Sequence, residues 1–96
     1  MRIRGFLHKG LKRLYAEDDP KGLPTDAVDK IRKMLAFLQD LENADELRAI
    51  AVWKAHRMSG NRRGAWSLHV TRNWRLTFTV DTAENEISDV NYEDYH

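Results

Sequence analysis

The sequence predicts an α+β fold in which two N-terminal helices pack on one face of a twisted antiparallel β-sheet. Two observations predict this class. Apolar residues recur at helical spacing between residues 28 and 41, and from residue 65 onward they alternate with polar residues, which is the period of a strand. The chain has 96 residues and no Gly-, Ser- or Pro-rich linker, so we expect a single domain, residues 1–96.

The N-terminal part is expected to hold a short strand over residues 2–6 and a helix over residues 8–18. The stretch DDPKGLP then interrupts the chain, and Thr25 or Asp26 is placed to cap a second helix. That helix is predicted to run to about residue 42. Its apolar stripe, which we assign to the core, consists of Val28, Ile31, Met34, Leu35, Leu38 and Leu41.

Residues 42–50 read as a polar turn or a short helical piece, and the strands follow. Strands are predicted over 65–70, 74–80 and 86–92, with a further one over 53–58, and closely spaced strands of this kind form an antiparallel meander. Ile87 breaks the alternation of the last strand. Alternation assigns one face of the sheet to the core, and the opposite, polar face carries Ser67, His69, Arg75, Thr77 and Thr79.

Charge is segregated along the chain although the formal net charge is only +1. Residues 1–15 and 48–75 carry arginine and lysine without any acid, whereas residues 76–96 carry acids without any base. The basic segment 48–75 also contains three tryptophans, a composition typical of a surface that meets RNA or another polyanion. The alternative is that these arginines pair with the acidic final strand. Composition alone leaves both interpretations open.

The cellular setting is expected to be the cytoplasm, with no membrane contact. The sequence has no cysteine, which excludes disulfides and thiolate metal sites. The N-terminus is basic but lacks the apolar region of a signal peptide, and no stretch approaches the roughly 20 apolar residues that span a bilayer.

Four histidines are the candidates for chemistry: His8, His56, His69 and His96. Their spacings match no zinc signature, and the sequence has no Gly-rich phosphate loop, so neither a metal nor a cofactor is expected. The remaining enzymatic option is metal-free proton transfer at a phosphate of RNA, whose 2′-hydroxyl is a built-in nucleophile. Such an enzyme needs a base, an acid and cations that stabilise the phosphorane, and histidine, tyrosine and arginine supply all three roles.

His96 is expected to have a raised pKa, because the α-carboxylate and Asp94 both favour the imidazolium form. A raised pKa suits a general acid. His56 lies in the basic segment, which pushes its pKa the other way and suits a base. The alternative is that His96 is a frayed end and His56 an ordinary surface histidine.

Several motifs together resemble the HigB branch of the RelE/ParE toxin superfamily. They are GAWSLHVTRNWRLTFTV, the terminal NYEDYH, the N-terminal GFLHKGLKRLY and the LP-containing break after it. The resemblance covers most of the chain. It implies a toxin of a bacterial toxin–antitoxin pair, an endoribonuclease that cuts mRNA in the A site of a translating ribosome, and it implies the same α+β fold.

The resemblance also suggests the site. By position, the residues that resemble the family's catalytic set are His56, Asp94, Tyr95 and His96. Arg75 resembles the arginine that stabilises the phosphate. The roles expected are base for His56, acid for His96, stacking or proton handling for Tyr95, and orientation of an imidazole for Asp94.

One departure from the family concerns a lysine that would touch the substrate phosphate. Relatives read H-P-L-K-G where this chain reads HRMSG, so Ser59 stands in place of the lysine, and a hydroxyl does not replace an ammonium at a phosphate. Arg57, Arg62 and Arg63 are the candidates to supply the charge, with Arg63 preferred. The predicted RNA-binding set consists of Lys54, Arg57, Arg62, Arg63 and His69.

The partners implied by the resemblance are a HigA-like helix-turn-helix antitoxin, the 70S ribosome and mRNA, with operator DNA bound only through the antitoxin complex. Two alternatives come from other classes. A ParE-like toxin of the same fold inhibits DNA gyrase by binding, without acid–base chemistry. A plain interaction domain with a polar sheet face would not harm the cell.

Overall fold

The computed structural model describes residues 1–49, 53–60, 62 and 64–95. Two of the predicted site residues, Arg63 and His96, therefore lie outside the described residues. In chain order the elements are β1 (Arg2–Ile3), α1 (Lys9–Glu17), α2 (Val28–Asp40), the 3-10 helix η1 (Ala44–Ala49), β2 (His56–Arg57), β3 (Ala65–His69), β4 (Trp74–Asp81) and β5 (Glu86–Asp94).

The strands form one sheet in the order β1-β5-β4-β3-β2, which confirms the α+β class. The pairs β2–β3, β3–β4 and β4–β5 are antiparallel, as predicted. The difference lies in β1, which runs parallel to β5 and makes the sheet mixed. The expected strand over residues 2–6 is also shorter, although Phe6 still forms a single parallel bridge with Val90.

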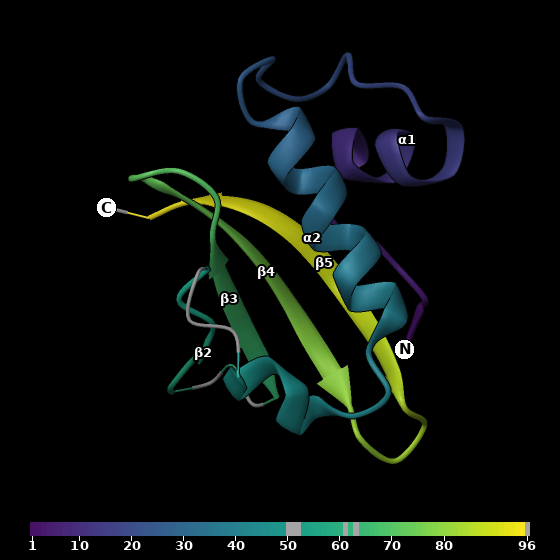
Figure 1. Cartoon of the computed structure of the whole chain (residues 1–96), viewed down its shortest axis with the longest axis vertical. Helices are drawn as coiled ribbons and strands as arrows, with labels where there is room; N and C mark the ends of the chain where they lie inside the picture. The colour runs from purple at the N-terminus through teal and green to yellow at the C-terminus, as the bar shows by residue number, and fades with distance from the viewer. Residues whose placement is uncertain (50–52, 61, 63, 96) are drawn as a thin grey trace.

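Both helices cover the same face of the sheet, with α2 crossing over β5 and α1 beside it (Figure 1). The whole predicted apolar stripe of α2 is buried there. The start of α2 differs from the expectation, because Ala27 occupies the N-cap position and makes no side-chain hydrogen bond. Helix α1 is instead capped by a side chain, since Nδ1 of His8 accepts from the backbone N–H of Leu11 at 3.2 Å.

A β-bulge in β5 explains why Ile87 breaks the alternation. The register shifts between Thr77 and Thr79 of β4, and Asp89 on the opposite strand has a φ of 54°. The extra residue leaves Ile87 and Val90 both fully buried although they are three apart. It also reverses the facing of everything after it, so that Glu93 and Tyr95 lie on the polar face.

The polar face is less open than the sequence indicates. Ser67 and Thr77 are fully buried, because neighbouring side chains cover them. Among the described residues, no helix has the length and the apolar character needed to cross a bilayer.

Candidate active site

A row of four side chains crosses the polar face from β5 to β2. The guanidinium carbon of Arg75 lies 5.3 Å from the centre of the Tyr95 ring. Arg75 is paired in register with His69 on β3, and the rings of His69 and His56 are 6.4 Å apart. The sheet thus brings together four of the predicted site residues, because directly opposed residues of neighbouring strands share a face.

His56 is exposed on the edge strand β2, and two neighbours hold its ring. Its Nδ1 lies 3.3 Å from the carbonyl oxygen of Lys54, and its Nε2 lies 3.2 Å from the hydroxyl of Ser67. With the proton on Nδ1, the ring donates to the carbonyl while Nε2 accepts from the hydroxyl. Ser67 therefore contacts the ring of His56. The sequence placed Ser67 on this face without giving it a role.

His69 has a lowered pKa. Burial is the main cause, and the positive charges of Arg75, Lys54 and His56 lower the pKa further. The imidazole is therefore neutral at pH 7 and able to accept a proton. Lys54, which is exposed, belongs to this cationic group of side chains.

Arg75 is buried, with 8% of its surface exposed, and it is held by the turn between β3 and β4. Its Nη1 donates to the carbonyl oxygens of Thr71, Arg72 and Trp74 at 3.0–3.1 Å. Its Nε has no hydrogen-bond partner among the described residues, and it is buried. The backbone N–H of Tyr95 donates to the carbonyl oxygen of Asn73 in the same turn, with an N···O distance of 2.6 Å. This hydrogen bond places Tyr95 beside Arg75.

A second cluster covers the centre of the polar face. Arg62 donates through both terminal nitrogens to the carboxylate of Glu93, at 3.2 and 2.7 Å. Glu93 also accepts a hydrogen bond from the hydroxyl of Thr77. The hydrogen bond with Arg62 is the main reason why the pKa of Glu93 is lowered, and the same bond raises the pKa of Arg62.

Sequence reasoning missed Glu93, although it lies in the same terminal motif as Tyr95. The signal was present in the broken alternation at Ile87, because a bulge there turns Glu93 to the polar face.

Other predicted site residues lie elsewhere. Asp94 is paired in register with Trp74, whose ring stacks on Tyr92 at 4.6 Å in the core, so the backbone places Asp94 on the face opposite to Arg75. Arg57 is paired with the buried Trp66 and likewise faces away from His56. Of the predicted RNA-binding set, the structure therefore brings Lys54, His69 and Arg62 to the polar face, but not Arg57.

The grouped side chains can carry out proton transfer beside a fixed positive charge. Among the described residues, the face offers two imidazoles, a phenol, two guanidiniums and a carboxylate. Among the residues that the structure describes, no three histidine, aspartate or glutamate side chains converge as metal ligands.

Solved structures with the same fold define the class. The YoeB/ParE toxin from Agrobacterium tumefaciens superimposes with a TM-score of 0.61 at 18% identity, over 100% of this chain and 99% of that one. The YoeB-YefM complex from Staphylococcus aureus gives a TM-score of 0.59 at 23% identity, over the same shares of the two chains. The fold is therefore that of the RelE and YoeB toxins.

Sequence comparison narrows the class to one family. The family described as "RelE-like toxin of type II toxin-antitoxin system HigB" matches residues 4–96. Endoribonuclease HigB from Proteus vulgaris is 38% identical over 94 residues, which cover 98% of this chain and 99% of that protein. The chain belongs to the HigB-like toxin family.

Proposed function

We propose that this toxin is a ribosome-dependent endoribonuclease that cuts mRNA in the ribosomal A site, by metal-free attack of a 2′-hydroxyl on the adjacent phosphate. The endoribonuclease activity follows from the family and from the relative in Proteus vulgaris. The observation that carries the chemistry is the row of His56, His69, Arg75 and Tyr95 on one polar face.

The proposed roles fall on this row and on His96. His56 is the base for the 2′-hydroxyl: the carbonyl of Lys54 keeps the proton on Nδ1, and Nε2 takes up the new proton once the hydroxyl of Ser67 turns away. Neutral His69, with its lowered pKa, is the second group able to take up that proton. His96 is the acid that protonates the leaving 5′-oxygen, and Tyr95 stacks on the nucleotide.

Arg75 supplies the positive charge that stabilises the phosphorane. Its buried Nε supports this role, since a buried donor without a partner is costly and a phosphate oxygen would satisfy it. The orientation of an imidazole stays assigned to Asp94, and Ser67, which contacts the ring of His56, is proposed to orient that imidazole.

The partners proposed are a HigA-like antitoxin, the ribosome and mRNA, with the cytoplasm as the place of action. The solved YoeB-YefM complex supports an antitoxin partner, because it shows a toxin of this fold in such an assembly. Ribosome binding is supported by the basic segment 48–75, which suits ribosomal RNA.

The test replaces His56 and His96 separately by alanine and maps mRNA cuts by primer extension during expression of each variant. His56→Ala and His96→Ala are expected to lower cleavage at least 100-fold, since one positioned acid or base contributes about 10²–10⁴ in rate. His8→Asn is the matched control: it removes an imidazole from the opposite face while asparagine keeps the helix cap. Wild-type cleavage by either alanine variant contradicts the assignment, and supercoiling defects with intact mRNA favour a gyrase poison instead.

A further inference from the structure

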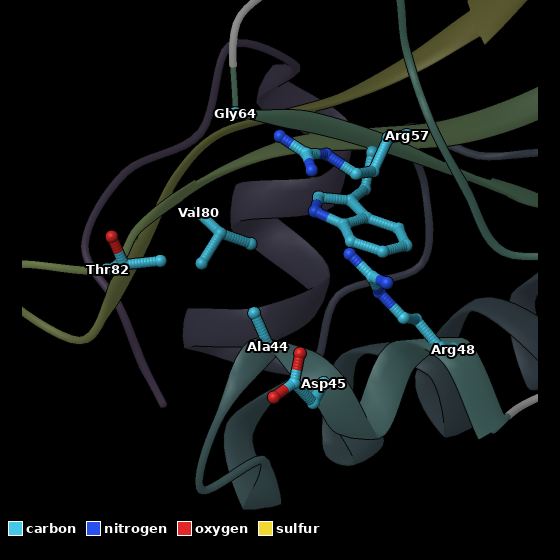
Figure 2. A pocket seen from close by; sticks show the side chains of 8 residues that line it. Ala44, Asp45, Arg48, Arg57, Gly64, Val80 and Thr82 are labelled. Atoms are coloured by element: carbon cyan, nitrogen blue, oxygen red, sulfur yellow. The ribbon is translucent and has the colours of Figure 1, made fainter.

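A pocket of about 180 Å³ opens on the face of the sheet opposite to the candidate active site. Trp66 of β3 and Val80 of β4 give it an apolar lining, and η1 contributes Asp45 and Arg48. Arg57 of β2 completes it, and Figure 2 shows the guanidinium groups of Arg48 and Arg57 reaching toward the same space from different elements.

The alternation of β2 places Arg57 here. His56 faces the active site, and the next residue faces the other way, directly opposite Trp66. Gly64 closes the pocket from the β2–β3 connection. It has a φ of +75°, and a Cβ there would come within 3.2 Å of the carbonyl oxygen of Val80, so the close approach of the two strands requires glycine.

Arg48 and Arg57 are both exposed, and neither forms a hydrogen bond or an ion pair within the described part of the chain. Other arginines are neutralised: Arg62 by Glu93 and Arg32 by Asp18. Both arginines line the same pocket, so an anion bound there can accept hydrogen bonds from either guanidinium. Asp45 lines the pocket without forming a salt bridge to either arginine among the described residues.

We propose that this pocket binds one nucleotide of the single-stranded RNA substrate, away from the cut site. The two guanidiniums contact backbone phosphates, and the apolar lining takes the base. This site rests on the proposed function, because it extends the RNA path from the row at His56.

The position of β2 favours the substrate strand over other anions. β2 is the edge strand of the sheet, and its two residues face the active site and the pocket in turn. A single-stranded RNA that passes over this edge of the sheet contacts His56 on one face and Arg57 on the other. The volume of about 180 Å³ is below the roughly 300 Å³ of a typical ligand pocket, which suits a single base.

The test measures binding of a short single-stranded RNA by fluorescence anisotropy, with 2′-deoxyribose at the cut position so that no cleavage occurs. Arg48→Gln and Arg57→Gln are each expected to weaken binding about fivefold at 0.1 M salt, since loss of one phosphate contact removes about 0.7 of a released counterion. The slope of log affinity against log salt should fall by about 0.7 for each variant. Arg13→Gln on α1 is the control, because it removes an exposed arginine that forms no ion pair among the described residues, and it is expected to change affinity less than twofold.

Binding equal to that of the control variant in both pocket variants overturns the proposal. Unchanged RNA binding with weakened antitoxin binding overturns it in favour of an acidic protein segment. Unchanged binding of the short RNA with weakened binding to ribosomes overturns it in favour of ribosomal RNA.

The measurement separates this proposal from the proposed mechanism. Because the RNA cannot be cleaved, weaker binding by the pocket variants supports the pocket even if the histidine variants retain activity. Conversely, loss of cleavage in His56→Ala together with unchanged binding in the pocket variants retains the mechanism and removes the pocket.

Discussion

Glu93 neutralises part of the positive charge on the polar face. It holds Arg62 through two hydrogen bonds, and it holds Thr77 through a third. Arg62 is one of the arginines that the sequence suggested as a substitute for the family lysine, whose position is occupied by Ser59 in this chain. In the free protein its charge is already neutralised, so a phosphate must compete with Glu93 for it.

We expect Glu93→Gln to bind the non-cleavable RNA more tightly, by up to about fivefold. The physical reason is release of Arg62 from an ion pair that is partly exposed, and such pairs are worth about 0.2–1 kcal/mol. The salt dependence should steepen as well, because one more cation is available to a phosphate. Anisotropy titrations at several salt concentrations measure both quantities.

The control for this variant is Glu84→Gln, which removes an equal charge from the exposed turn between β4 and β5. If Glu93→Gln binds no more tightly than Glu84→Gln, Arg62 is not restrained in the way the structure indicates.

Among the elements, β5 has the largest effect on the site, through its bulge. Before the bulge the buried apolar residue is Ile87, and after it the buried apolar residues are Val90 and Tyr92. Strict alternation from Ile87 would direct Glu93 and Tyr95 to the helices. The extra residue, Asp89, directs them to the polar face instead, so the bulge is what assembles the C-terminal side of the site.

Replacement of Asp89 by valine is expected to lower the free energy of unfolding by about 1–2 kcal/mol, because its φ of 54° is costly for a β-branched side chain. Asn tolerates this conformation, so Asp89→Asn should retain wild-type stability within a few tenths of a kcal/mol. Urea unfolding of the two variants measures the difference. Equal stability of the valine and asparagine variants would show that the bulge is not strained at this residue.

The elements themselves were predictable from periodicity, because long apolar patterns report burial directly. The stripe of α2 is confirmed by its burial, and so are the predicted inward apolar residues of β3 and β4. Burial itself does not alternate along these two strands, because Ser67, Arg75 and Thr77 on the polar face are buried as well. The parallel pairing of β1 was not predictable, since two residues carry no period. The cap of α2 was wrong for a related reason: Thr25 and Asp26 have the right chemistry, but the turn places Ala27 at the helix start.

The site was predictable only where alternation was unbroken. It placed His69 and Arg75 on one face, and the register pairs them. The alternation of apolar and polar residues did not predict which face each residue of β2 lies on, because β2 has only two residues. The opposite directions of His56 and Arg57 follow only from the pairing with β3. The ion pair between Arg62 and Glu93 joins residues 31 apart, a contact that no local pattern reports.

In the molecule as a whole, the order of the strands decides which segregated charges meet. The acidic strand β5 lies beside β1, where Arg2 and Arg4 reach Glu86 at 3.7 and 3.6 Å. Its other end meets Arg62. For segment 48–75, the pairing interpretation is therefore confirmed at Arg62. The interpretation as a surface for a polyanion stays a prediction for Arg48 and Arg57, which form no ion pair among the described residues.

Three groups, His8, His69 and Glu93, give the whole fold an expected dependence on pH. Burial is the main cause that lowers the pKa of His8 and of His69, and the bond with Arg62 is the main cause that lowers the pKa of Glu93. In each case the unfolded chain binds a proton at a higher pH than the folded protein does. Stability is therefore complete at neutral pH and declines as the pH falls, first below the ordinary histidine pKa of 6.5 and again below the ordinary glutamate value of 4.5.

Urea midpoints measured at steps from pH 7.5 to pH 3.5 check this dependence. His8 faces the ring of Tyr92 and accepts from the backbone of Leu11, so its protonation also breaks the cap of α1. His8→Asn is expected to flatten the decline between pH 7 and pH 5 and to leave the lower window unchanged. Glu93→Gln should flatten the decline below pH 4.5 instead, because its side chain does not titrate. Slopes in both variants that match the wild type in both windows would mean that other groups carry the acid sensitivity of the fold.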